Sequence, residues 1–203
     1  MNDKLTLVFL GRSGCGKGTQ AKFVLKRLEA QGVFHLETGR FIRELLACKN
    51  PTTEIARASL DEQGKLFPWW FAMFLWLREL IEHGHADKHI IGDGTPRRVG
   101  EAKFLDEVLS WHERSLPVCI YIDVSEEEAT RRLLARGSGR ADDNLDAIRS
   151  RMQFFYEDVM PVIDYYEEHG RLISVDGNVS PDEVWQQIDR MLGERLGAKW
   201  PRA

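Results

Sequence analysis

A glycine-rich stretch near the N-terminus has the residue types and spacing that phosphate chemistry requires. Gly11, Gly16 and Lys17 stand in the pattern Gly-x-x-x-x-Gly-Lys, after an apolar run at residues 5–10 and before apolar residues spaced along one helix face. The expected order is therefore strand, glycine-rich turn and helix, which is the setting of a phosphate-binding loop. Glycines let the backbone wrap its N–H groups around phosphate oxygens, and Lys17 adds a full positive charge at the β- and γ-phosphates.

The composition indicates a globular protein that needs no charged macromolecule as a partner. Of the 203 residues, 43% are hydrophobic and 30% are charged, and the net charge of −4 gives no electrostatic reason to expect nucleic acid. The three cysteines lack the spacing of metal ligands, and no signal-peptide pattern opens the sequence, so we expect a cytoplasmic protein. The longest strongly apolar stretch, residues 66–77, is too short to span a membrane.

The order of apolar segments predicts the fold class. Five short apolar runs alternate with helical patterns, at residues 5–10, 33–36, 89–93, 117–123 and 171–175. Such alternation predicts an α/β fold of the P-loop NTPase type, a parallel five-stranded sheet covered by helices on both faces. We expect one domain with two small inserts, because the sequence has no internal repeat and no long linker.

Several helices carry local signals. The segment 68–82 is apolar almost all round, which favours burial in the core over a dimer surface, although both remain open. Thr38 is expected to cap the helix that follows it, and Ser180 with Glu183 forms a capping box. Pro161 is expected to kink or break a long helix.

Further motifs give the sequence a specific resemblance. Gly-Lys-Gly-Thr-Gln at residues 16–20 resembles the adenylate kinase family, and more pieces follow in that family's order from about residue 5 to about residue 192. These pieces are Thr38-Gly39-x-x-x-Arg43, Gly64-Lys65-Leu66-Phe67-Pro68, Asp93-Gly94-Thr95-Pro96-Arg97, Arg136, Arg140-x-Asp142-Asp143-Asn144 and Arg151.

The resemblance implies a single nucleoside monophosphate kinase domain. Its core would comprise residues 1–37, 66–135 and 145–203, with a small helical insert for the monophosphate at about 38–65 and a short lid at about 136–144. The activity would be transfer of the γ-phosphoryl group of ATP to a nucleoside monophosphate, with AMP as the leading acceptor and Mg²⁺ as cofactor. The lid has no cysteines for a zinc site. We expect a monomer, with a homodimer left open, and no membrane or nucleic-acid partner.

The resemblance also assigns residues. Contacts to ATP would come from Gly14, Cys15, Gly16, Lys17, Gly18, Thr19, Arg136, Arg140 and Val179. The monophosphate site would comprise Thr38, Gly39, Arg43, Lys65, Leu66, Phe67, Gly94, Arg97, Glu101, Arg140 and Arg151. Catalysis would depend on Lys17, Arg97, Arg140 and Arg151, and Asp93 would sit near Mg²⁺ through water. These residue types suit phosphoryl transfer, which needs charge stabilisation and in-line positioning more than acid–base groups.

Four positions depart from the family pattern. Glu101 stands where the family has a Gln that pairs with adenine, Thr95 replaces a Phe, Phe67 is larger than the usual Val, and Arg40 replaces an Asp. An ionised carboxylate only accepts hydrogen bonds, so a GMP- or pyrimidine-preferring kinase is the alternative within the class, while a protonated Glu101 would recover the donor for adenine. Glu101 could also point outward, and Arg40 could contact the acceptor phosphate or solvent. A non-catalytic nucleotide-binding regulatory protein is the alternative from another class.

Overall fold

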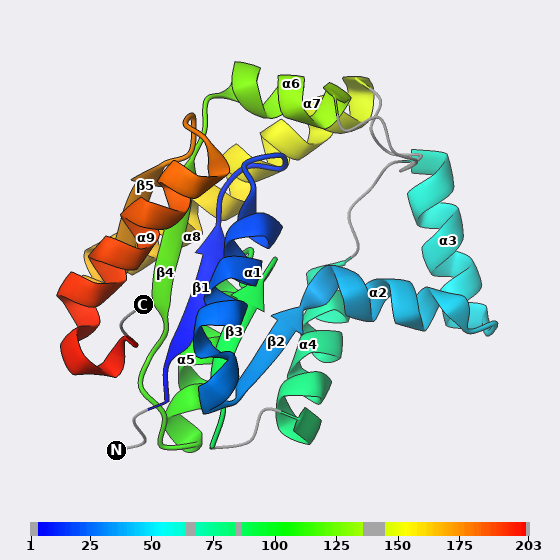
Figure 1. Ribbon diagram of the computed structural model, residues 1–203. Coiled ribbons are helices and arrows are strands. Elements are labelled where there is room, and N and C mark those ends of the chain that lie inside the picture. Colours follow the sequence, from blue (N-terminus) through cyan, green and yellow to red (C-terminus); the bar gives the residue numbers. More distant parts are fainter. Residues whose placement is uncertain (1–3, 64–67, 84–86, 136–144, 202–203) are drawn as a thin grey trace.

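A five-stranded parallel sheet forms the centre of the protein (Figure 1). The computed structural model describes residues 4–63, 68–83, 87–135 and 145–201. The spatial order of the strands is β2-β3-β1-β4-β5, and every pair is parallel. Their bounds are β1 Thr6–Leu10, β2 Val33–Glu37, β3 His89–Asp93, β4 Val118–Asp123 and β5 Leu172–Asp176. The predicted fold class and all five predicted strands are confirmed.

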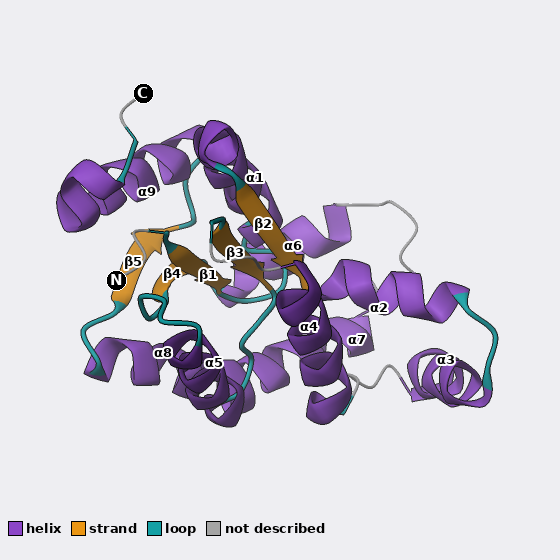
Figure 2. Ribbon diagram, turned by 90° about the horizontal axis from the view of Figure 1, so that it is seen from below, coloured by secondary structure: helices purple, strands orange, loops and turns teal. Residues whose placement is uncertain are grey.

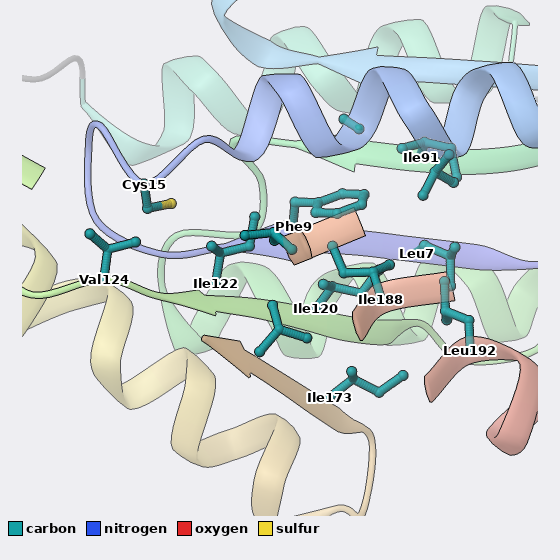
Figure 3. Packing of buried hydrophobic residues seen from close by; sticks show 14 of the residues in the cluster. Leu7, Phe9, Cys15, Ile91, Ile120, Ile122, Val124, Ile173, Ile188 and Leu192 are labelled. Carbon is teal, nitrogen blue, oxygen red and sulfur yellow. The ribbon is translucent and has the colours of Figure 1, made fainter. Parts of the chain in front are cut away.

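Helices cover both faces of this sheet (Figure 2). On one face lie α1 (Lys17–Leu28) and α9 (Pro181–Leu196), and on the other lie α4 (Trp69–His83), α5 (Val99–Trp111) and α8 (Met160–Glu168). Because successive side chains of a strand point to opposite faces, Leu7 and Phe9 of β1 join one apolar cluster and Val8 and Leu10 join the other. Figure 3 shows the first cluster, where β1 and β4 side chains meet Ile188 and Leu192.

The remaining helices lie beyond the covered faces of the sheet. The pair α2 (Thr38–Ala47) and α3 (Pro51–Gln63) projects from the β2 edge, whereas α6 (Glu126–Ala135) and α7 (Leu145–Phe154) lie above the loop that joins β1 to α1 (Figure 1). Short 3₁₀ turns occur at Glu29–Gln31 and Gly197–Lys199. No helix within the described ranges is long and apolar enough to cross a membrane.

Helix α4 is only half buried, so the segment favoured for the core also has an exposed apolar face. Trp76 is completely buried, whereas Trp70 is 55% exposed. The buried face carries Phe71, Leu75, Trp76 and Leu80, and the exposed residues are Trp69, Trp70, Phe74 and Ile81. The all-round apolar pattern favoured burial in the core, but a helix that packs against the margin of a sheet has only one face to bury.

Two of the three remaining local signals are confirmed. Ser180 and Glu183 form both hydrogen bonds of a capping box. A π-helical segment, η2 (Phe155–Val159), interrupts the long helix and ends two residues before Pro161. Such a wider turn accommodates a residue that lacks an N–H donor. The prediction for Thr38 is wrong, because α2 already begins at Thr38 and Glu37 takes the cap position, without a side-chain hydrogen bond to cap the helix.

The imidazole of His89 ties the start of β3 to the start of β1. Its Nδ1 accepts a hydrogen bond from the N–H of Leu5 at 3.0 Å, and its Nε2 lies 3.0 Å from Oε1 of Gln31. Accepting at one nitrogen and donating at the other requires the neutral ring. Burial, together with the positive charges of Lys4 and Arg114, lowers the pKa of His89 to about 4.

Because His89 is neutral in the folded protein, we expect the free energy of unfolding to depend on pH. In the unfolded chain His89 takes up its proton near its ordinary pKa of 6.5, whereas in the folded protein it does so only near pH 4. Lowering the pH from 6.5 to 4 therefore stabilises the unfolded state relative to the folded one. Urea unfolding from near pH 7 to near pH 4 should show wild type losing up to about 3 kcal/mol more than His89→Gln, whose amide does not titrate. Equal losses in both proteins would contradict this assignment.

Candidate active site

The loop between β1 and α1 has the backbone of a phosphate-binding turn. Gly11, Gly14 and Gly16 adopt φ of 145°, 88° and 98°, conformations that side chains with a Cβ rarely take. Gly14 also packs closely under α6, because a Cβ there would lie 2.7 Å from the carbonyl oxygen of Ala129. The helix α1 begins at Lys17, so its positive dipole end faces this loop.

The ammonium group of Lys17 is held over the loop. Its Nζ donates to the carbonyl oxygens of Gly11 and Arg12, both at 2.8 Å, and lies 3.6 Å from Sγ of Cys15. The side chain of Cys15 is buried in the apolar cluster (Figure 3), so only the backbone of this residue is available to a phosphate. Gly18 and Thr19 complete the first turn of α1. The structure therefore brings a cation, a loop backbone and a helix N-terminus to one place.

The carboxylate of Asp93 faces the same place. Asp93 is the last residue of β3 and pairs in register with Phe9 of β1. A Cβ on Gly18 would lie 3.3 Å from Oδ2 of Asp93, so this oxygen approaches the first turn of α1. Carboxylate oxygens are ligands that Mg²⁺ accepts, directly or through water. Asp93 thus lies close to the phosphate loop.

The loop after β3 places a partly buried arginine beside a buried glutamate. Nε of Arg97 donates to the carbonyl oxygen of Gly94 at 2.9 Å, and Gly94 has φ of 84°. The backbone N–H of Arg97 donates to Oε2 of Glu101 at 3.1 Å. Burial lowers the pKa of Arg97, against the opposing effect of the nearby carboxylates Glu101 and Asp93.

Glu101 does not point outward, so that alternative is wrong. The residue is 4% exposed. Burial raises the pKa of its carboxyl group, with the N–H and the charge of Arg97 acting in the opposite direction. Glu101 therefore faces the interior of the protein, where burial disfavours the ionised form of its carboxyl group. Thr95 is also buried, and its Oγ1 has no hydrogen-bond partner within the described ranges.

Residues at the start of α2 form the side of the site next to β2. Thr38 is buried, and its hydroxyl has no hydrogen-bond partner among the residues that the structure describes. The guanidinium of Arg43 lies 2.8 Å from Oε1 of Glu37 and folds back over Gly39. Arg40 is half exposed and lies 3.4 Å from Glu44 Oε1, so it faces the outer surface of α2. Arg43, rather than Arg40, is the arginine held at the end of β2.

Two further predicted residues lie on more distant elements. Arg151 is partly buried in α7, and Val179 packs partly buried against the first apolar cluster, directly before α9. The other predicted contacts, Lys65, Leu66, Phe67, Arg136 and Arg140, lie outside the described residues.

Sequence reasoning missed two charged side chains at this edge of the sheet. Glu37 pairs with Arg43, and Arg12 contacts Tyr156. The spacing of Glu37 and Arg43 on neighbouring elements could have suggested their pairing. No local pattern could have revealed the contact of Arg12 with a residue so far along the chain.

The close approach at Gly14 gives a test of the loop's packing. Gly14→Ala should lower the free energy of unfolding by about 1–3 kcal/mol, because a positive φ is strained for alanine and its Cβ would meet α6. Gly100→Ala is the control, since a Cβ there meets nothing within 4 Å and a helical alanine should be neutral or stabilising by up to about 1 kcal/mol. Urea unfolding measures both, and equal midpoints would show that the loop tolerates a side chain at Gly14.

Comparisons with known proteins agree with this geometry. Residues 9–171 match the family described as adenylate kinase. The chain is 38% identical to the adenylate kinase of Thermus thermophilus over 189 residues, which cover 92% of this chain and 96% of that protein. It is 33% identical to adenylate kinase 1 of a Nostoc species, over 92% of this chain and 98% of that protein. It is also 34% identical to UMP-CMP kinase 1 of Oryza sativa, over 94% of this chain and 75% of that protein.

The family match covers most of the chain and includes the phosphate loop from Gly11 to Lys17, together with Asp93 and Arg97. The two adenylate kinases, at 38% and 33% identity, align with this chain almost from end to end. The chain therefore belongs to the adenylate kinase family and is a phosphotransferase that uses ATP and a nucleoside monophosphate.

Proposed function

We propose that this enzyme transfers the γ-phosphoryl group of ATP to AMP and releases two molecules of ADP. The bond between the γ-phosphorus and its bridging oxygen breaks, and a phosphate oxygen of AMP forms the new bond. The observation that carries the proposal is the convergence of Lys17, Asp93 and Arg97 at one edge of the sheet, where the N-terminus of α1 also points.

Each basic group has a separate part in this proposal. The loop amides and Lys17 hold the phosphates of ATP, while Arg43 and Arg97 hold the phosphate of the acceptor. Arg140 and Arg151 stabilise the charge of the phosphoryl group in transit. Arginine suits these parts because its planar fork bonds two phosphate oxygens at once. The ion pair between Arg43 and Glu37 is partly exposed, so an incoming phosphate can displace the carboxylate at little cost.

A divalent cation fits the acidic group beside the loop. Asp93 would hold Mg²⁺ through water, because its Oδ2 approaches the turn that receives the phosphates. The bound ion would neutralise charge on the phosphate oxygens. We propose that residues 38–65 form the acceptor insert and residues 136–144 the lid. We also propose a cytoplasmic, monomeric enzyme; the free cysteines Cys15, Cys48 and Cys119 support the location.

The environment of Glu101 supports AMP as the acceptor. Burial raises the pKa of this carboxyl group. A protonated carboxyl group offers one donor and one acceptor, as a glutamine amide does, and so suits the edge of adenine. The competing proposal is a pyrimidine nucleotide or GMP as acceptor, which an ionised Glu101 and the small Thr95 favour. The similarity to a protein named UMP-CMP kinase supports testing the pyrimidine alternative.

An ADP-formation assay with each monophosphate tests this choice. Wild type should prefer AMP over GMP, CMP and UMP, and Glu101→Gln should change kcat/KM for AMP by less than about threefold at a pH low enough to protonate Glu101. Because the protonated form is the active one, wild-type kcat/KM should fall as the pH rises through the raised pKa of Glu101, whereas Glu101→Gln should show no such fall.

The control is Glu107→Gln, an exposed change on the same helix that should keep the wild-type pH profile. A wild-type preference for another base that shifts toward AMP in Glu101→Gln would contradict the AMP proposal. Absence of ADP with every monophosphate would favour the non-catalytic nucleotide-binding protein.

A further inference from the structure

Arg12 extends from the phosphate loop into a network that reaches three other elements. Its Nη1 donates to the carbonyl oxygen of Val124 at 2.9 Å and lies 3.4 Å from Oδ1 of Asp123, at the end of β4. Its Nη2 donates to the hydroxyl of Tyr156 in η2 at 2.9 Å. Both terminal nitrogens are thus engaged by protein groups, and the side chain is only 12% exposed.

Aromatic rings hold the guanidinium in place from the side of η2. Its central carbon lies 4.4 Å from the ring centre of Phe155 and 5.1 Å from that of Tyr156. Cation–π contacts of this kind strengthen when the cation is shielded from water, and Phe155 is 1% exposed. The planar guanidinium stacks and donates at the same time, which an ammonium group cannot do.

The hydroxyl of Tyr156 extends the network to α6. The Tyr156 hydroxyl accepts from Arg12 and lies 3.2 Å from Oε2 of Glu126. On the other side, the Tyr121 hydroxyl donates to Oδ1 of Asp123 at 2.7 Å. Arg12 is therefore the residue through which the loop, the end of β4, η2 and α6 are connected.

The position of Phe155 connects this network to Arg151. Phe155 comes four residues after Arg151 and so continues the same helix face by about one turn. The backbone of Arg12 also accepts from Nζ of Lys17 at 2.8 Å. Arg12 thus contacts the helix that carries Arg151 with its side chain and the ammonium of Lys17 with its main chain.

We propose that Arg12 is a positioning residue that fixes Arg151 relative to the phosphate loop. The proposal rests on the proposed role of Arg151 in stabilising the phosphoryl group in transit. Arg12 itself is assigned no reacting atom, since both of its terminal nitrogens are bound within the protein. It acts by holding η2 and α7 against the loop, because displacing a catalytic group by about 1 Å lowers a rate up to about a hundredfold.

A double-mutant cycle tests this proposal through kcat. Arg12→Met should lower kcat about 10- to 100-fold while changing KM for ATP and AMP by less than about threefold. In the Arg151→Met background the same change should lower kcat by less than about threefold, because the group that Arg12 positions is gone. Tyr156→Phe, which removes only the hydroxyl, should show a smaller loss with the same coupling, and it serves as the test if Arg12→Met fails to fold.

Arg98→Met is the matched control. Arg98 also pairs with η2, through Nε to Oδ1 of Asp158 at 2.8 Å, but it lies at the start of α5 and not in the phosphate loop. Its kcat should stay within about twofold of wild type. Each variant's thermal unfolding is measured alongside.

The outcomes separate this proposal from the one on which it rests. If Arg151→Met lowers kcat but the losses simply multiply, Arg12 acts independently of Arg151 and the positioning proposal is wrong while the proposed function stands. If Arg98→Met lowers kcat as much as Arg12→Met, the effect belongs to η2 in general and the proposal is also wrong. If Arg151→Met leaves kcat unchanged, both the role of Arg151 and its positioning by Arg12 are overturned.

Discussion

The constraint on which this structure depends is the tight turn between β1 and α1. Its backbone can follow this path because Gly11, Gly14 and Gly16 take positive φ, and Gly14 lets the turn lie directly under α6. The turn aims the start of α1 at the same place that Lys17 covers with its ammonium group. A backbone of this shape concentrates positive potential without a large net charge on the protein, which suits a phosphate ligand.

The parallel sheet brings the other groups to this turn. Because parallel strands all end at one edge, Asp93 of β3 lies next to the end of β1, and Glu37 of β2 lies in register with Asp93. Both faces of the sheet are covered by apolar clusters, so the strands are held firmly and the charged residues gather at their ends. The fold therefore supplies rigid positions for arginines and carboxylates that come from separated parts of the chain.

The sequence predicted those features that arise from local pattern. Apolar runs placed all five strands, and the spacing of glycines and Lys17 placed the loop, because both signals are contained in short segments. It failed where the outcome depends on distant packing. The exposed half of α4 follows from which neighbours cover it, and the contact of Arg12 with Tyr156 joins residues far apart in sequence. Glu101 was expected in the monophosphate site, but only its burial excludes the outward alternative. The prediction that Thr38 caps its helix was wrong for a local reason, because the helix begins one residue earlier than expected.

The central claim is that charge stabilisation at the phosphate loop carries phosphoryl transfer, and Lys17→Met tests it most directly. The measurement is the rate of ADP formation from saturating ATP and AMP with Mg²⁺, made on variant and wild type of equal thermal stability. The account predicts that kcat falls by at least about a thousandfold, because the proposed role of Lys17 is to place a full positive charge at the β- and γ-phosphates. A loss of less than about tenfold, with the variant folded, would show that the chemistry depends on other groups and would contradict the account.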